Sequence, residues 1–401
     1  MNKFFKFSLY LASALVLSAG FVGCDDDDDP VQTPGVPETE NKELTNILTQ
    51  YANNTVVATY SRLADASLVL EDACENLYNK TNAGNATIAD VQKACDAWIA
   101  SRVWWERSEA FLLGPANIMG IDPHIDSWPL DKAKLDNLLA SEEIMKELDA
   151  EYITTNLGSG GLCGFHALEY VIYKDGKAKP AEEISADLAK FAYAVSGDLS
   201  LQCLILEAAW AGADNVASNK LAIMEAADAV PDGAFRDNFI NAGKSGSRYR
   251  TQLEALVEAI KSDNGCFGIA AEVGDTKISD PVKSQDVLDV ESWYSFNSKA
   301  DFQDNIRGIE NVIMGGLRED GLRNEAYSIY TFLKAHNAKL AEELKQAIAT
   351  CIGEDGTTGI GTIKYPFRDH LSEADNAEAI KSCQDLNAKL EEVASYIQEN
   401  L

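Results

Sequence analysis

The chain has 401 residues with 64 acidic and 34 basic side chains, which gives a formal net charge of −30 at pH 7. A strongly acidic chain without a cluster of lysines and arginines repels a phosphate backbone, so no nucleic-acid partner is expected. Because 46% of the residues are hydrophobic and 24% are charged, the composition is that of a globular protein rather than a disordered one. A chain of this length exceeds what one hydrophobic core usually holds, so two domains are expected.

The N-terminus has the features of an export signal. A short basic start precedes an apolar run over residues 7–22, which is too short to span a membrane comfortably and is followed by Gly23-Cys24. The tetrapeptide 21–24 resembles a bacterial lipobox, so residues 1–23 are predicted to be a signal peptide and Cys24 the lipidated mature N-terminus. The alternative is an ordinary signal peptide with an incidental cysteine.

Residues 24–40 are predicted to form a tether. A run of aspartates directly follows Cys24, and a proline-containing stretch follows the run, so the segment repels itself and cannot form a packed element. An acidic run behind a lipidated cysteine resembles the surface-export signal of lipoproteins in the Bacteroides group. We therefore expect a cell-envelope protein that is lipid-anchored to the outer membrane at the cell surface, with periplasmic exposure as the alternative.

The cysteines after Cys24 are irregularly spaced and contain no Cys-x-x-Cys pair, so no disulfide framework is indicated. Most of them are expected to be buried as small hydrophobic side chains. Cys74 and Cys95 are candidates for pairing across adjacent helices, and the sequence leaves that pairing open.

Apolar residues recur at three- and four-residue steps along most of the chain, which is typical of amphipathic helices. Thr87 with Asp90, and Ser372 with Asp375, have the spacing of N-caps. In chain order, helices are expected at 43–80, 87–111, within 131–156, from about 162–164, and at 181–213, 216–228, 234–262, 299–317, 324–350 and 373–399.

The same pattern predicts an all-α fold. No convincing alternation of apolar and polar residues with β-branched or aromatic enrichment occurs. Long helices joined by moderate loops are typical of helical bundles, and two are expected in a chain of this length. The predicted domains are an N-terminal bundle over 41–215 and a C-terminal bundle over 216–401.

Among the four histidines, His166 is the strongest candidate for chemistry. His166 and Glu169 are three residues apart on a predicted helix, so both side chains lie on one face and can reach a common point. Gly164 removes a side chain where another group could approach closely, and the positive helix start favours the neutral imidazole that binds metal. The alternative is a structural His–Glu hydrogen bond, which spacing alone makes the commoner case.

The other histidines are weaker candidates. If Ser372 is the N-cap of the last helix, His370 lies outside that helix and cannot share a face with Glu373. His336 falls in a solvated pattern, and His124 is expected at the surface of a loop.

The second predicted helix carries Glu106 and Glu109, which are also three residues apart, with Arg102 one turn before Glu106. One interpretation is an ordinary intrahelical ion pair between Arg102 and Glu106. The other is that a carboxylate of this helix completes a mixed oxygen and nitrogen site in a bundle core. Asp126 and Trp128 add an acid and an indole in the loop that follows.

The sequence itself gives little support for hydrolysis. It contains no His-Glu-x-x-His, no Gly-x-Ser-x-Gly and no phosphate-binding loop. One histidine and one glutamate do not supply the three ligands and the base that metal-assisted hydrolysis needs.

Five short motifs occur in a set order along the chain. They are Trp105-Glu106, Gly114-Pro115, Asp126-Ser127-Trp128-Pro129-Leu130, Gly164-Phe165-His166-Ala167-Leu168-Glu169 and Ser292-Trp293-Tyr294-Ser295-Phe296-Asn297-Ser298. Together they resemble the imelysin family, over about residues 43–400. The resemblance implies two helical bundles, an envelope location, a link to iron uptake and a metallopeptidase label, with Gly-x-His-x-x-Glu at the functional site.

We therefore predict an imelysin-like lipoprotein that binds iron, another divalent metal or an iron chelate in iron uptake, together with a transporter that the sequence does not identify. His166 and Glu169 are the expected metal ligands, with Glu106 as a third. The remaining residues of the binding site are expected to be Gly164, Arg102, Glu109, Asp126 and Trp128.

Two alternatives stay open. The first is a metal-dependent peptidase with Glu169 as base, which a further histidine brought close in space, His124 or His336, would favour. The second is a surface interaction module in which the pair of His166 and Glu169 is structural.

Overall fold

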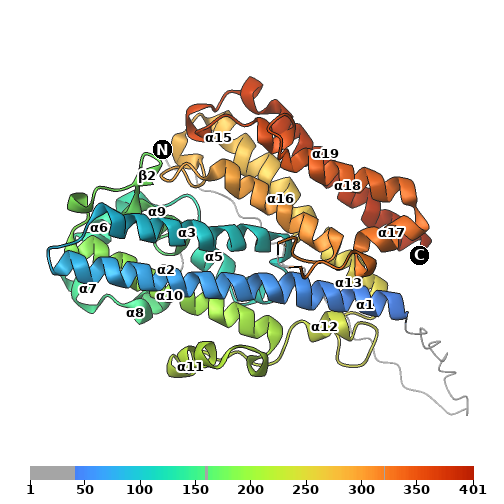
Figure 1. Cartoon of the computed structure of the whole chain (residues 1–401), viewed down its shortest axis with the longest axis horizontal. Helices are drawn as coiled ribbons and strands as arrows, with labels where there is room; N and C mark the ends of the chain where they lie inside the picture. The colour runs from blue at the N-terminus through green and yellow to red at the C-terminus, as the bar shows by residue number, and fades with distance from the viewer. Residues whose placement is uncertain (1–40, 159–160, 320) are drawn as a thin grey trace, which may run out of the picture. The chain divides into compact units, whose positions relative to one another are not determined.

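The computed structural model describes residues 41–158, 161–319 and 321–401, whose regular secondary structure is almost all helix (Figure 1). The predicted all-α fold class is confirmed. The predicted signal peptide, Cys24 and the tether lie outside the described residues. Within those residues, no helix is both long and apolar enough to cross a membrane.

The first expected helix forms and contains a wider turn. It consists of α1 (Lys42–Gln50), the π-helix η1 (Tyr51–Val57) and α2 (Ala58–Asn82). Asn41 starts it, because its side-chain oxygen accepts hydrogen bonds from the first free backbone amides of α1. The apolar periodicity predicted the helix and did not reveal the π turn.

The second helix, α3 (Ile88–Ser108), continues into the 3₁₀ turn η2 (Glu109–Phe111). Asp90 Oδ2 accepts hydrogen bonds from the backbone amide and the hydroxyl of Thr87 at 3.0 and 2.7 Å, which confirms the predicted cap. The long helix α10 (Ala186–Ala211) packs on α2, so that α2, α3 and α10 run side by side (Figure 1).

Short elements connect α3 to α10. Three of these helices, of six to eight residues, begin at a residue whose side chain accepts a hydrogen bond from a backbone amide of the first turn. Such a cap stabilises the start of a short helix. After α9, two strands of two residues each pair antiparallel. The elements are α4 (Pro115–Ile118), α5 (Ile121–Ile125), α6 (Lys132–Leu139), α7 (Glu142–Glu147), α8 (Ala150–Asn156), α9 (Gly164–Ile172), β1 (Tyr173–Lys174), β2 (Lys177–Ala178) and the 3₁₀ turn η3 (Ala181–Glu183).

The second half is also helical, with three differences from expectation. The expected helix 234–262 is interrupted at Gly243 and Gly246, both with positive φ, and 324–350 is interrupted at Asn337, which caps the next helix. Helical turns over 266–284 were not predicted. The elements are η4 (Ala213–Asn215), α11 (Ser218–Ala226), α12 (Asp237–Ile240), α13 (Gln252–Lys261), α14 (Cys266–Glu272), the π-helix η5 (Val273–Ile278), α15 (Ser279–Ser284), η6 (Val287–Asp289), α16 (Ser298–Met314), η7 (Glu325–Tyr327), α17 (Ile329–His336), α18 (Ala338–Ile352), η8 (Gly359–Thr362), η9 (Phe367–Asp369) and α19 (Glu373–Asn400).

The contact between α3 and α16 joins the two halves and positions the site. At Gly308 of α16, a Cβ would lie 2.3 Å from the backbone oxygen of Arg107, so only glycine allows the two helices to approach this closely. One hydrophobic core extends from α1 to α19. The division into bundles 41–215 and 216–401 stays a prediction.

All the cysteines from Cys74 to Cys383 are buried free thiols, as expected for most of them. Cys74 and Cys95 are not paired in the structure.

Candidate functional site

Arg102 of α3 lies at the centre of a buried polar cluster and is itself fully buried. Its Nη1 pairs with Asp126, and its Nη2 pairs with Glu106 and, at 2.6 Å, with Glu291 Oε1. Its Nε lies 3.9 Å from Asp301 Oδ2. Burial acts to lower the pKa of Arg102, but the surrounding carboxylates outweigh it and raise the pKa, so the guanidinium is always charged. The intrahelical pair of Arg102 and Glu106 therefore exists as one part of a larger network.

His166 of α9 places its two ring nitrogens against different acids. Nδ1 lies 3.4 Å from Glu169 Oε2, as the i, i+3 spacing predicts. Nε2 lies 3.2 Å from Asp126 Oδ1 and 3.9 Å from Glu291 Oε1, which come from other segments. Trp128 covers the ring, with 4.6 Å between ring centroids. Burial acts against the charged imidazole, but hydrogen bonds to Asp126 and Glu169 outweigh it and raise the pKa of His166 to about 9. The expectation that the helix start keeps the imidazole neutral is therefore wrong here, because the two acids favour the charged ring, and a metal ion would have to displace a ring proton.

Gly164 makes the encounter between Asp126 and His166 sterically possible. It has a φ of +75°, and a Cβ at this position would lie 2.0 Å from the backbone oxygen of Ile125. The group that approaches Gly164 is therefore the end of α5, immediately before Asp126. This close contact brings Asp126 to the first turn of α9.

Glu169 connects α9 to a strained loop. Its Oε1 accepts hydrogen bonds from the backbone amide and the hydroxyl of Ser295, both at 2.7 Å. In the same loop Ser292 and Phe296 have φ values of +52° and +65°, a conformation that costs energy for residues other than glycine. Glu291 directly precedes this loop. The same segment therefore supplies Glu291, which faces Nε2 of His166, and Ser295, which holds Glu169 against Nδ1.

Lys277 of η5 enters the cluster from the second half. Its Nζ lies 2.8 Å from Glu109 Oε2, 3.2 Å from Glu291 Oε2 and 3.7 Å from Glu106 Oε2. Asn305 of α16 donates through Nδ2 to Glu106 Oε2 at 2.6 Å and to Glu109 Oε2 at 2.8 Å. Burial acts to lower the pKa of Lys277, but these carboxylates raise it, so the ammonium stays charged.

Burial and charge give the acids of the cluster different protonation states. Burial raises the pKa of Glu106 to about 7, and Arg102 and Lys277 offset it only in part. Burial also acts to raise the pKa of Asp126, but Arg102 and His166 outweigh it and hold that pKa far below its ordinary value. Asp126 is therefore ionised at every physiological pH, whereas Glu106 titrates near neutrality.

A few buried polar atoms of this cluster have neither a hydrogen bond nor a close ion pair. They are Ser292 Oγ, Asp301 Oδ2, Asn305 Oδ1 and Arg102 Nε, the last of which lies 3.9 Å from Asp301 Oδ2. Three more atoms lack a hydrogen bond and have a charged neighbour instead: Glu106 Oε1 pairs with Arg102 Nη2, Glu291 Oε2 lies 3.2 Å from Lys277 Nζ, and His166 Nε2 lies 3.2 Å from Asp126 Oδ1. Unpaired buried acceptors are costly, so the free oxygens of Ser292, Asp301 and Asn305 leave room for a positively charged group.

The cluster also contains the donor atoms that a metal requires. One ligand atom each of Asp126, His166 and Glu291 lie within 4.8 Å of one another, and so do one each of Glu106, Glu109 and Asp126. Imidazole with carboxylates suits divalent iron, manganese or zinc. The donor set and the unpartnered acceptors therefore fit a metal ion.

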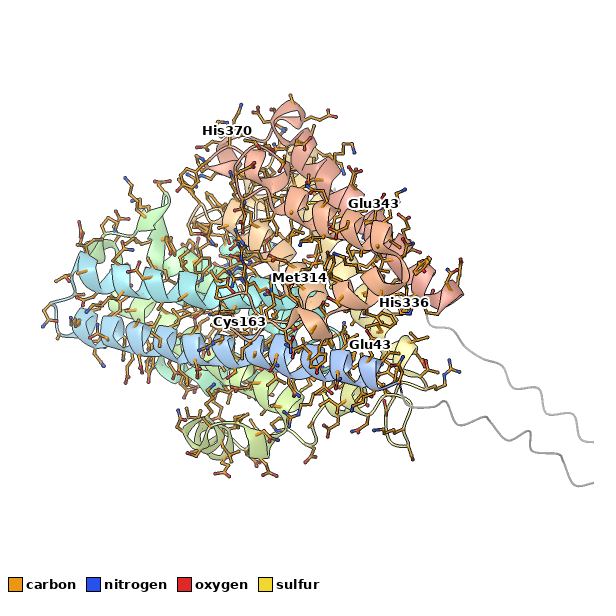
Figure 2. All side chains as sticks on the ribbon, turned by 45° about the vertical axis from the view of Figure 1, so that its right-hand side comes forward. Glu43, Cys163, Met314, His336, Glu343 and His370 are labelled. Atoms are coloured by element: carbon orange, nitrogen blue, oxygen red, sulfur yellow. The ribbon has the colours of Figure 1, made fainter. Side chains whose placement is uncertain are left out.

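The other histidines lie apart from His166. His124 was expected at a loop surface, but it is buried in α5 and its Nε2 lies 2.7 Å from Asp198 Oδ2, because α10 packs over α5. Figure 2 shows His336 and His370 at the periphery of the C-terminal half, away from Cys163. In the part of the chain that the structure describes, the metal-competent group around His166 contains no second histidine.

The sequence did not single out Lys277, Glu291, Asp301 and Asn305. Asp301 and Asn305 are polar residues on the apolar face of an amphipathic helix, a signal that could have found them. Lys277 lies in a helical stretch that was not predicted, and Glu291 directly precedes the motif that starts at Ser292.

The fold and this buried cluster define an all-helical protein with a metal-competent centre, and comparisons assign its family. A family model described as Imelysin matches residues 56–393, so the chain belongs to the imelysin family. The chain is 27% identical to iron-regulated protein A of Synechococcus elongatus over 300 residues, which are 75% of this chain and 72% of that protein.

Solved structures agree with this assignment. A crystal structure of an iron-regulated protein A precursor from Parabacteroides distasonis is 28% identical, with a TM-score of 0.74 over 90% of this chain and 96% of that chain. An imelysin-like protein from Psychrobacter arcticum shares the fold at 14% identity, with a TM-score of 0.54 over 89% and 93% of the two chains. The predicted family resemblance is confirmed.

Proposed function

We propose that this imelysin-family protein binds one iron ion at His166 and takes part in iron uptake at the cell envelope. The observation that carries the proposal is the convergence of His166 Nε2 with carboxylates of Asp126 and Glu291, in a buried cluster that also holds unpartnered oxygens of Ser292 and Asp301. These three residues come from three separate segments, which is typical of a site rather than of a local cap. The names of the relatives, which describe iron-regulated proteins, support an iron-related role.

In this proposal Glu169 positions His166 and is not a direct ligand. Its Oε2 faces Nδ1, and its Oε1 is occupied by Ser295, so Nε2 is the ring atom directed at Asp126 and Glu291. A carboxylate at the far ring nitrogen fixes the tautomer of a metal-bound histidine and raises its basicity. Glu106, expected from the sequence as the third ligand, belongs to the neighbouring group with Glu109.

Arg102 has two effects on the proposed site. It holds Asp126 and Glu291 near Nε2 of His166, which prepares the ligands. It also competes with a cation for the same oxygens, which weakens binding. Moderate affinity suits a protein that takes up an ion and passes it to a transport partner, and such a partner is part of the proposal.

The anchoring of the protein is proposed from the sequence. Lipid on Cys24 and an acidic tether over 24–40 would hold the folded part near the outer membrane. Metabolic labelling with a radioactive fatty acid tests this, because label is expected in the parent chain and not in Cys24→Ala.

Titration calorimetry of Fe²⁺ under anaerobic conditions tests the site on the metal-stripped chain. We expect one ion per chain in the parent, and a loss of at least about 100-fold in affinity in His166→Ala and Glu291→Gln, because each removes a ligand. His336→Ala is the matched control, since His336 is exposed on α17, and it should bind as the parent does. Absence of binding in the parent, or unchanged binding in His166→Ala, would rule out the site and favour a structural pair in an interaction module.

A further inference from the structure

A second group of carboxylates next to the proposed iron site already holds a positive charge. Glu106, Glu109 and Asp126 place one oxygen each within 4.8 Å of one another. An all-oxygen group of this kind is what a hard divalent cation prefers. The ammonium of Lys277 lies against two of its members, at 2.8 Å from Glu109 and 3.7 Å from Glu106.

The surroundings of this second group also have a spare acceptor. Glu106 is fully buried, and only 5% of Glu109 is exposed. Asn305 holds both carboxylates through Nδ2, while its own buried Oδ1 has no hydrogen-bond partner. Glu106 Oε1 pairs with Arg102 Nη2, so Asn305 Oδ1 is the unpartnered buried oxygen beside this group.

Lys277 reaches the group because its backbone is wound as a π-helix. The turn η5 is held tightly against α19, where a Cβ on Gly274 would lie 2.8 Å from Cys383 Cβ. Turns of this kind are rare, and those that occur are frequently at functional sites. The lysine thereby crosses from the second half to the acids of α3 and η2.

We propose that Lys277 is a built-in cation that fills the second group and limits this centre to one metal ion. The proposal rests on the proposed function for the first ion. Helical bundles that hold two ions take ligands from residues three apart, Glu-x-x-His, on facing helices, and Glu106 with Glu109 has that spacing with a second acid in place of the histidine. Asp126 belongs to both groups, as a bridging acid would.

The ammonium of Lys277 places one positive charge where a second ion would bind, and because it is covalently attached it does not dissociate. It also contacts Glu291 at 3.2 Å, so it links the filled group to a ligand of the first. Lys277 is thus a residue that determines specificity, since it sets how many ions the centre accepts.

The test is the stoichiometry of Fe²⁺ binding, measured by anaerobic titration calorimetry on the full chain. The parent and Lys277→Arg, which keeps the charge, are expected to bind one ion. Lys277→Met removes the charge at similar length and is expected to bind two. The double variant Lys277→Met with Glu109→Gln is expected to return to one, because the second group loses a carboxylate.

A further double variant, Lys277→Met with His166→Ala, separates the two proposals. Binding of one ion there, when the parent binds none, would support the role of Lys277 and overturn the proposed function. A folded Lys277→Met that binds no more ions than the parent would overturn the role of Lys277.

Folding of the variants is followed by circular dichroism with and without Fe²⁺. If Lys277→Met unfolds without metal, recovery of the helical signal on adding Fe²⁺ supports the proposal. A variant that stays unfolded with metal, while Lys277→Arg folds, overturns it.

Discussion

The clusters around His124 and His166 are built from the same two segments and differ in how completely their polar atoms are paired. The end of α5 supplies His124 to the first cluster, and Asp126, directly after α5, belongs to the second. Cys163, which belongs to the first cluster, directly precedes α9, and α9 carries His166 of the second. Both clusters hold ligand atoms within 4.8 Å of one another. The spacing of these atoms alone does not distinguish the two clusters, although a cysteine belongs to one and a glutamate to the other.

The hydrogen bonds do distinguish them. Around His124, Asp198 accepts from Thr154 at 2.6 Å and lies 2.7 Å from the imidazole, and the Cys163 thiol donates to the His124 backbone oxygen at 3.1 Å. No side-chain nitrogen or oxygen of these four residues is both buried and unpartnered, whereas the His166 cluster leaves Ser292 Oγ, Asp301 Oδ2 and Asn305 Oδ1 without a partner. A completed network stabilises the fold, and an incomplete one is open to a ligand.

The largest effect is expected from Gly164→Ala, which damages both clusters. The new Cβ would lie 2.0 Å from the Ile125 backbone oxygen, so α5 and α9 cannot keep their contact. We expect a loss of more than about 4 kcal/mol in the free energy of unfolding, measured by urea denaturation. The control Gly120→Ala also has a positive φ, +67°, but meets open space, and should cost only about 1–2 kcal/mol. Equal losses in the two variants would contradict this explanation.

His124→Ala is expected to lower stability and leave iron binding intact. It removes the buried partner of Asp198, which is fully buried on α10. Breaking a buried pair on one side costs about 3 kcal/mol, and the free energy of unfolding should fall by that order. Calorimetry on the same sample should give the affinity of the parent. If His124→Ala weakens Fe²⁺ binding as strongly as His166→Ala, the two clusters are one site and the comparison fails.

Glu169→Gln is expected to weaken iron binding by about 10–100-fold with little change in stability. The amide oxygen can still accept from Ser295, while its NH₂ group would donate to Nδ1 of His166 and leave the proton on Nε2, where the metal binds. Ser295→Ala is the control, since it removes one of the two hydrogen bonds to Glu169 and should have a smaller effect. Unchanged affinity in Glu169→Gln would show that Nδ1 does not need a carboxylate.

The smallest effect is expected far from both clusters, at the start of α3. Hydrogen bonds from Lys80 and Thr87 hold the pKa of Asp90 well below its ordinary value. A carboxylate with a lowered pKa in the folded state stabilises the fold above its unfolded pKa of about 3.9, and this contribution is lost as the pH falls further. Asp90→Ala should therefore cost about 1 kcal/mol at pH 7.

The pH dependence checks the sign of this effect. In urea titrations the difference between the parent and Asp90→Ala should shrink below about pH 4, since the parent loses its advantage as Asp90 is protonated. A difference that grows toward acid pH would show that the cap does not act through the ionised carboxylate.

Features that depend on residues a few positions apart could be predicted from the sequence. The helices, the Thr87 cap, the shared face of His166 and Glu169, and the pair of Arg102 and Glu106 all follow from i, i+3 and i, i+4 geometry, which any α-helix imposes. The interrupted helices at Gly243 and Asn337 show the limit of this reasoning, because apolar periodicity continues across a short break.

Only the tertiary structure decided what surrounds those local pairs. Glu291 contacts Arg102 across 189 residues of sequence, and Lys277 contacts Glu109 across 168. Contacts this far apart in the sequence leave no periodic signal. The sequence by itself determined most of the helices, the family resemblance and the choice of His166 as the leading candidate. The packing of α16 and η5 on α3 decided which carboxylates meet His166 and which already hold a lysine, because long-range contacts depend on how whole helices fit together and not on the spacing within any one of them.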